Sequence, residues 1–228
     1  MTICAITSFL IGRAMRFVIC AILIVAALGL QSRDARAIVL STSIAANNDN
    51  FGEVFQIGAI VDLTITDFGI DAIRSGQLGT PGDITAFTIY QHLGVLNAAT
   101  AGAAIWTSIF TGGAVTSAGA GVFTNLSAGL NIHIAAGETD AFLILLTPNT
   151  MGYRNGGSVG TLLTSNADLK IFQGWGTNGG FATFEPRQAA VSVTYDVSTL
   201  PEPASIALFG LGLSGLALTR RRSATASG

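Results

Sequence analysis

Cysteine is almost absent from this 228-residue chain. The two cysteines, Cys4 and Cys20, both lie near the N-terminus, and residues 38–200 contain none. Disulfides, thiolate metal ligands and cysteine nucleophiles are therefore excluded from this long central segment. Whatever stabilises the segment must come from packing and hydrogen bonds.

Basic residues are also scarce in the centre of the chain. Residues 38–200 carry eleven acidic side chains but only four cations, which gives this segment a net charge of −7. A segment this acidic is not expected to bind nucleic acid, since that binding depends on neutralising phosphates with lysine and arginine. The charge suits solubility outside the cell or attraction of divalent cations. The four cations are Arg74, Arg154, Lys170 and Arg187.

Recognisable catalytic motifs are missing as well. The sequence has no G-x-S-x-G nucleophile elbow, no H-E-x-x-H helix and no P-loop. His92 and His133 are the only imidazoles, and both are interpreted as solvent-facing residues at or near strands. We therefore predict no enzymatic activity, no catalytic residues and no cofactor.

The N-terminus has the organisation of an export signal. Arg16 precedes an apolar run at residues 17–30, and Ala35-Arg36-Ala37 forms an A-x-A cleavage site. Residues 1–37 are therefore predicted to be a signal peptide, cut by signal peptidase after Ala37. Translation from Met15 would give a signal of more ordinary proportions, so the start at Met1 or Met15 is left open.

The C-terminal residues 200–228 combine three features. Pro201-Glu202-Pro203 is followed by an uncharged apolar run at residues 204–219, and then by a basic cluster. A helix over the apolar run would be about 24 Å long, and the cluster would hold its end in the cytoplasm. The run is therefore predicted to be a transmembrane helix in the inner membrane. The basic cluster consists of Arg220, Arg221 and Arg222.

This three-part pattern resembles the PEP-CTERM sorting domain of exopolysaccharide-producing Gram-negative bacteria. The resemblance covers Leu200 to about Ser223, and Leu200 stands where the family usually has valine. It implies that the membrane enzyme exosortase recognises and processes the tail at Pro201-Glu202-Pro203. The alternative is an ordinary single-pass anchor that is never processed.

Between the two signals, residues 38–199 are predicted to form one all-β domain. Apolar and polar residues alternate along four stretches, as expected for strands with one buried face. Phe142 to Leu146 is apolar at every position and is predicted to be a central strand covered on both faces. We expect an antiparallel β-sandwich of jelly-roll type. The alternating stretches are residues 61–66, 87–90, 130–134 and 191–196.

Ligand sites in this domain are suggested by only a few residues. Asn166 and Asp168 belong to a block, continued by Arg187, that resembles the last third of a common PEP-CTERM ectodomain of unknown function. Arg187 is expected to pair with Asp168 or Glu185. Trp175 lies between two glycines and is predicted to be exposed in a loop, where it could stack on a sugar, together with Trp106 and Tyr153.

Glu138 and Asp140 are the weak candidates for a metal site or a carboxylate pair, because residues two apart share a strand face. A structural Ca²⁺ held by separate loops also remains open. The leading hypothesis is an exported, non-enzymatic protein of the cell envelope or extracellular matrix, associated with exopolysaccharide or biofilm. The alternatives are a carbohydrate-binding module at the cell surface and, third, a secreted hydrolase.

Overall fold

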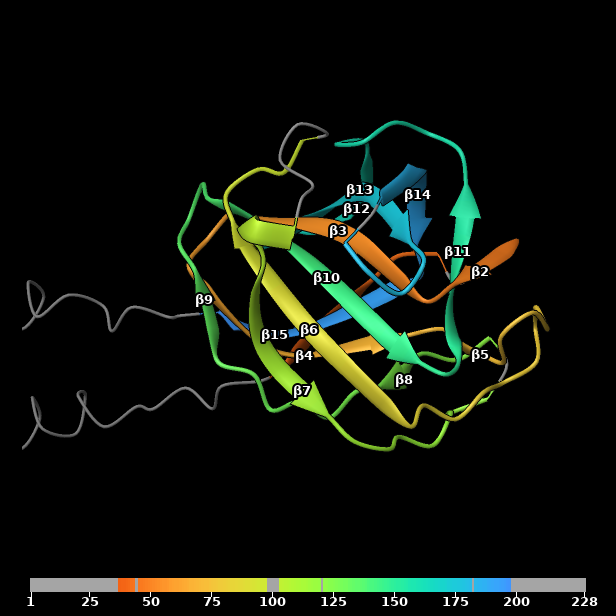
Figure 1. Cartoon of the computed structure of the whole chain (residues 1–228). Helices are drawn as coiled ribbons and strands as arrows, with labels where there is room; N and C mark the ends of the chain where they lie inside the picture. The colour runs from red at the N-terminus through yellow and green to blue at the C-terminus, as the bar shows by residue number, and fades with distance from the viewer. Residues whose placement is uncertain (1–36, 44, 98–102, 120, 182, 198–228) are drawn as a thin grey trace, which may run out of the picture. The chain divides into compact units, whose positions relative to one another are not determined.

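The computed structural model describes residues 37–43, 45–97, 103–119, 121–181 and 183–197. These residues form two antiparallel β-sheets packed face to face (Figure 1). The predicted all-β antiparallel sandwich is confirmed. The described part contains one short 3₁₀ turn, η2 (Ala103–Ile105), and no helix in it is long and apolar enough to cross a membrane.

The smaller sheet has five strands. Its order is β1 (Ile38–Ser41), β15 (Val191–Val197), β4 (Leu63–Ile70) and β8 (Thr124–Asn125), and β9 (Ile132–Ile134) also pairs with β4. The first and last strands of the domain are therefore direct neighbours, with Ile38 opposite Tyr195. This pairing closes the domain by joining its two chain ends in one sheet.

The larger sheet has ten strands, more than one sheet of a plain eight-stranded jelly roll. Strands β3, β10 and β6 lie side by side across its middle (Figure 1). Two short strands lie off the main path, with β12 (Leu162–Ser165) on β13 and β5 (Ala72–Ile73) on β11. The main order is β2 (Asn48–Asn50), β11 (Thr150–Asn155), β14 (Thr183–Ala189), β13 (Leu169–Thr177), β3 (Gly52–Ala59), β10 (Thr139–Thr147), β6 (Ala86–Leu93) and β7 (Thr107–Gly112).

The main core lies between the two sheets and is built from the alternating residues. Phe55, Phe68 and Phe142 are fully buried, and their ring centroids lie 5.2–6.0 Å apart. Aromatic contacts at this spacing add to the area that the rings bury. Apart from Val61, which precedes β4, the apolar residues of the four predicted alternating stretches lie here, for example Leu63 and Val193.

A second apolar cluster covers the other face of the larger sheet. Val54, Ala141 and Leu143 project there, because they alternate with core residues along β3 and β10. Leu96, from the segment after β6, is 1% exposed and packs against them. Strand β10 therefore has apolar neighbours on both faces, which confirms the prediction for Phe142 to Leu146.

Candidate functional site

Asn166 and Asp168 form a hydrogen-bonded lock at the turn between β12 and β13. The Asn166 side-chain oxygen accepts from the backbone N–H groups of Asp168 (2.9 Å) and Leu169 (3.0 Å). The Asn166 amide donates to the Tyr195 hydroxyl (2.6 Å), which donates to the Asp168 carboxylate (2.9 Å). Both predicted ligand residues are thus engaged in tying this turn to the last strand.

Tyr195 itself is fully buried. Burial raises the pKa of its phenol to about 12, and the neighbouring Asp168 carboxylate adds to the rise. A negative charge on the phenol would lie beside that carboxylate, so the neutral form is favoured. The lock therefore depends on a protonated tyrosine.

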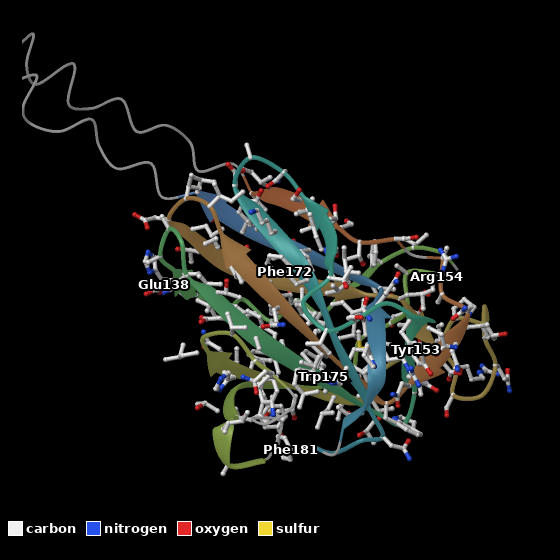
Figure 2. All side chains as sticks on the ribbon, turned by 90° about the horizontal axis from the view of Figure 1, so that it is seen from above. Glu138, Tyr153, Arg154, Phe172, Trp175 and Phe181 are labelled. Carbon is white, nitrogen blue, oxygen red and sulfur yellow. The ribbon has the colours of Figure 1, made fainter. Side chains whose placement is uncertain are left out.

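Glu138 and Asp140 do not form a carboxylate pair. Asp140 is 5% exposed, and its two oxygens accept from the Gly94 backbone N–H (3.0 Å) and from the Gln91 side chain (2.8 Å). Glu138 precedes β10 and is exposed at one end of the sandwich (Figure 2). Asp140 fixes the end of β6, and the described residues contain no group of acids and histidines suited to a metal ion.

The prediction that Trp175 is an exposed loop residue is wrong. Trp175 lies in β13, is 5% exposed and packs in the second cluster with Val54 and Leu143 (Figure 2). The register of β13 shifts between Gln173 and Gly176, and this bulge turns the indole onto the outer face of the sheet. Its ring is therefore unavailable for stacking on a sugar.

The other two aromatic candidates do not join Trp175 in a platform. Tyr153 is 5% exposed in β11, and the Arg187 guanidinium lies 5.1 Å from the centre of its ring. Trp106 is half-buried and contacts His92 edge-on, while the Nδ1 of His92 lies 3.2 Å from the Ile105 carbonyl oxygen. His133, as predicted, is exposed on β9.

Arg187 does not make the first of its two predicted pairs, because the Asp168 carboxylate accepts from Tyr195 instead. The side chain of Glu185, the other predicted partner, lies outside what the structure describes. Arg187 lies beside Glu53, a fully buried acid in β3, and no described residue makes a hydrogen bond to either carboxylate oxygen of Glu53. Burial raises the pKa of Glu53 well above its ordinary value. The charge of Arg187 and the side-chain amide of Asn50 only partly offset this rise.

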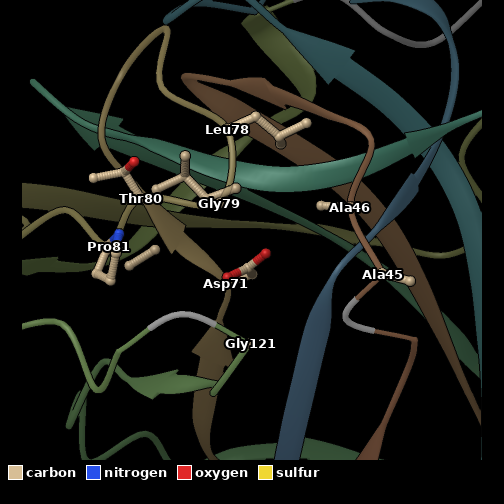
Figure 3. Close-up of a pocket in the computed structure, with 10 residues that line it drawn as sticks. Ala45, Ala46, Asp71, Leu78, Gly79, Thr80, Pro81 and Gly121 are labelled. Atoms are coloured by element: carbon tan, nitrogen blue, oxygen red, sulfur yellow. The ribbon is translucent and has the colours of Figure 1, made fainter.

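A pocket lies where the chain passes from the smaller sheet to the larger one. Asp71, the single residue between β4 and β5, directs its carboxylate into a cavity of about 360 Å³ (Figure 3). Asp71 is 6% exposed, and burial raises the pKa of its carboxyl group. The sequence pattern predicted no site at Asp71 or Glu53, because neither belongs to a local motif.

The remaining predicted site residues are those of the two terminal signals. Ala37 is exposed immediately before β1. The other members of these sites lie outside the residues that the structure describes. They are Ala35, Pro201, Glu202, Pro203, Arg220, Arg221 and Arg222.

Comparison with known families identifies the sorting motif in the C-terminal segment. Residues 199–222 match the model described as the PEP-CTERM protein-sorting motif. The chain carries a PEP-CTERM motif. The match covers the predicted tripeptide, the apolar run and the arginine cluster, and the motif marks an exported protein that is sorted by exosortase. A protein with this motif is first anchored in the membrane and then reaches the cell surface.

The comparisons give no comparable assignment for the domain before the PEP-CTERM motif. No curated protein matches the chain. The structure of infectious bursal disease virus Gt strain matches at 12% identity and a TM-score of 0.21, covering 72% of this chain and 37% of that one. The VP2 subviral particle of the same virus matches at 14% identity and a TM-score of 0.15, covering 79% and 47%. The chain spans less than half of either relative, and similarity at these TM-scores supports no argument.

Proposed function

We propose that this protein is a non-enzymatic component of the cell envelope or extracellular matrix, associated with the exopolysaccharide of the producing cell. The observation that carries the proposal is the PEP-CTERM motif directly after a closed β-sandwich. The polar residues singled out in the sandwich support it, because Asn166, Asp168 and Asp140 are engaged in internal hydrogen bonds.

The proposed mechanism concerns how the protein is delivered to the cell surface. Signal peptidase would cut after Ala37, and the apolar run at residues 204–219 would halt translocation in the inner membrane. Exosortase would then act at Pro201-Glu202-Pro203 and release the sandwich to the cell surface. Since the sandwich pairs β1 with β15, its two processed ends would leave from one sheet.

The carbohydrate-binding alternative loses its main residue, because Trp175 is buried. The hydrolase alternative relied on Glu138 and Asp140, which the fold separates into an exposed and a buried acid. We therefore propose neither carbohydrate binding through Trp175 nor hydrolysis by Glu138 and Asp140.

Fractionation of the producing cells tests the matrix role. The native chain and a variant with Ala at Pro201, Glu202 and Pro203 are followed in the membrane, surface-matrix and medium fractions. A strain that makes no exopolysaccharide is the matched control. The proposal predicts that the native chain fractionates with the matrix only when the polysaccharide is present, and that the variant stays in the membrane. A native chain that distributes identically in both strains would contradict the exopolysaccharide association.

A further inference from the structure

The backbone of Asp71 is fixed from two sides. Its N–H donates to the Ala190 carbonyl oxygen (3.3 Å), and its carbonyl oxygen accepts from the Gly152 N–H (2.8 Å). These bonds hold the residue between the segment before β15 and strand β11, so its side chain has a defined direction. The carboxylate faces the pocket between Ala46 and the segment Leu78–Pro81 (Figure 3).

No described residue donates a hydrogen bond to the Asp71 carboxylate, which faces the open pocket, while the residue as a whole is 6% exposed. Gly152 provides the room beside it, since a methyl group there would come within 2.5 Å of the Asp71 Oδ2. A partly desolvated acid without a donor is stabilised when a cationic or hydrogen-bond-donating ligand pairs with it.

The wall opposite Asp71 is already formed. The segment between β5 and Pro81 is closed by a bond from the Arg74 N–H to the Thr80 carbonyl oxygen (2.8 Å). It is held against β2 by the Gly76 N–H, which donates to the Asp49 carboxylate (3.1 Å). A preformed wall lowers the cost of ordering a bound ligand.

The described lining of the pocket carries one charge and is otherwise small or apolar. Among the described residues that line it, Asp71 is the only charged one, alongside side chains such as Ile73, Leu78 and Pro81. A volume of about 360 Å³ lies at the lower end of the range for small-molecule sites. A second hollow of about 560 Å³ near Phe87 and Pro148 has no charged residue among its described lining, so it offers less chemical specificity.

We propose that this pocket binds the primary ammonium group of a small ligand, with Asp71 as the acceptor. An ammonium group is compact, has three donors and forms charge-assisted hydrogen bonds with a carboxylate. A divalent cation fits less well, because Ca²⁺ takes six to eight oxygen ligands and the pocket supplies one carboxylate. The ammonium group can come from an amino sugar or from an aliphatic amine. This site does not depend on the proposed matrix role.

The test is calorimetric titration of the full chain in nonionic detergent with n-butylamine, glucosamine, N-acetylglucosamine and calcium chloride. At least one of the two amines is expected to bind saturably, whereas the neutral N-acetylglucosamine is not. Stronger binding of glucosamine would indicate an amino-sugar ligand, and stronger binding of n-butylamine an aliphatic one. Absence of binding by both amines, or saturable binding of calcium that depends on Asp71, overturns the proposal.

Three variants test whether amine binding takes place in the Asp71 pocket. Asp71→Asn is expected to weaken amine binding by about 10- to 100-fold, the range for losing a charged hydrogen-bond partner. Glu138→Gln removes the same charge at an exposed residue that does not line the pocket, and it is expected to change nothing. Leu78→Lys, at a rim residue that is 47% exposed, places a competing ammonium group at the mouth and is expected to block binding without unfolding the domain. Unchanged binding in both pocket variants overturns the assignment.

Discussion

At the scale of single residues, Glu53 is the least expected feature of the fold. Burial favours the neutral form of this acid and raises its pKa, because the nearby Arg187 and Asn50 only partly offset the loss of solvent. The folded state then binds a proton more tightly than the unfolded state. Above the ordinary glutamate pKa, the unfolded chain has released this proton while the folded chain retains it, so the free energy of unfolding falls as pH rises.

Glu53→Gln should remove this pH dependence. The variant is expected to match the wild type near pH 4 and to equal or exceed its stability at pH 7, because an amide has no proton to lose. Urea denaturation at several pH values measures this, with Glu138→Gln as the exposed control. A loss of about 3 kcal/mol or more at pH 7 would show instead that Glu53 is ionised and paired with Arg187.

Trp175→Ala should behave as a core substitution. Removing a buried indole from the cluster with Val54 and Leu143 is expected to cost about 3–5 kcal/mol of unfolding free energy. Trp175→Phe should lose less, and Trp106→Ala, at a half-buried position, should also lose less. Denaturation midpoints of the three variants give the comparison. A Trp175→Ala variant as stable as the wild type would contradict this packing.

At the scale of secondary-structure elements, the hydrogen bonds of Tyr195 join the turn between β12 and β13 to β15. Because the Tyr195 pKa is raised to about 12, the contribution of its neutral hydroxyl is complete below pH 10. It is lost as pH rises from about 10 to 12, where the unfolded chain releases the proton first.

Tyr195→Phe is therefore expected to cost about 1–3 kcal/mol at neutral pH, since it leaves Asn166 and Asp168 without their partner. The difference from the wild type should shrink between pH 10 and 12. Urea denaturation at pH 7 and pH 11 tests both statements. A constant difference at the two pH values would mean that the hydroxyl does not titrate as described.

The elements also show why some features were predictable and others were not. Strand β10 could be predicted because every residue of Phe142 to Leu146 is apolar, which is the pattern of a strand with both faces covered. Trp175 was misread because its flanking glycines suggested a loop. In the fold, Gly174 lies against the Val54 backbone, where a Cβ would clash, so the glycine permits close strand packing at a bulge.

The two polar features that the sequence did not indicate both depend on distant pairing. Glu53 and Arg187 come together only through the β3–β13–β14 pairing, with Gly176 opposite Glu53 and Gly174 opposite Arg187. Asp71 becomes a pocket residue only because β4 and β5 join different sheets. Local periodicity carries no information on such long-range contacts, so these two features could be found only from the structure.

At the scale of the whole molecule, charge is distributed differently in the two terminal segments and in the folded domain between them. Seven of the eleven basic residues lie outside residues 38–200, in the two terminal segments, and leave an acidic domain between them. Positive charge close to apolar runs serves orientation in a membrane, while an acidic surface keeps an exported domain soluble. The PEP-CTERM match at residues 199–222 falls in the second of these segments.

Sorting by exosortase is tested most directly by the intact mass of the protein from the envelope and medium of its producing cell, with and without the exosortase gene. We expect a form that begins at Ile38 and ends near Pro201–Pro203, found only when exosortase is present. A form that retains Arg220–Arg222 in both strains would show that the tail is a plain anchor and would contradict sorting by exosortase.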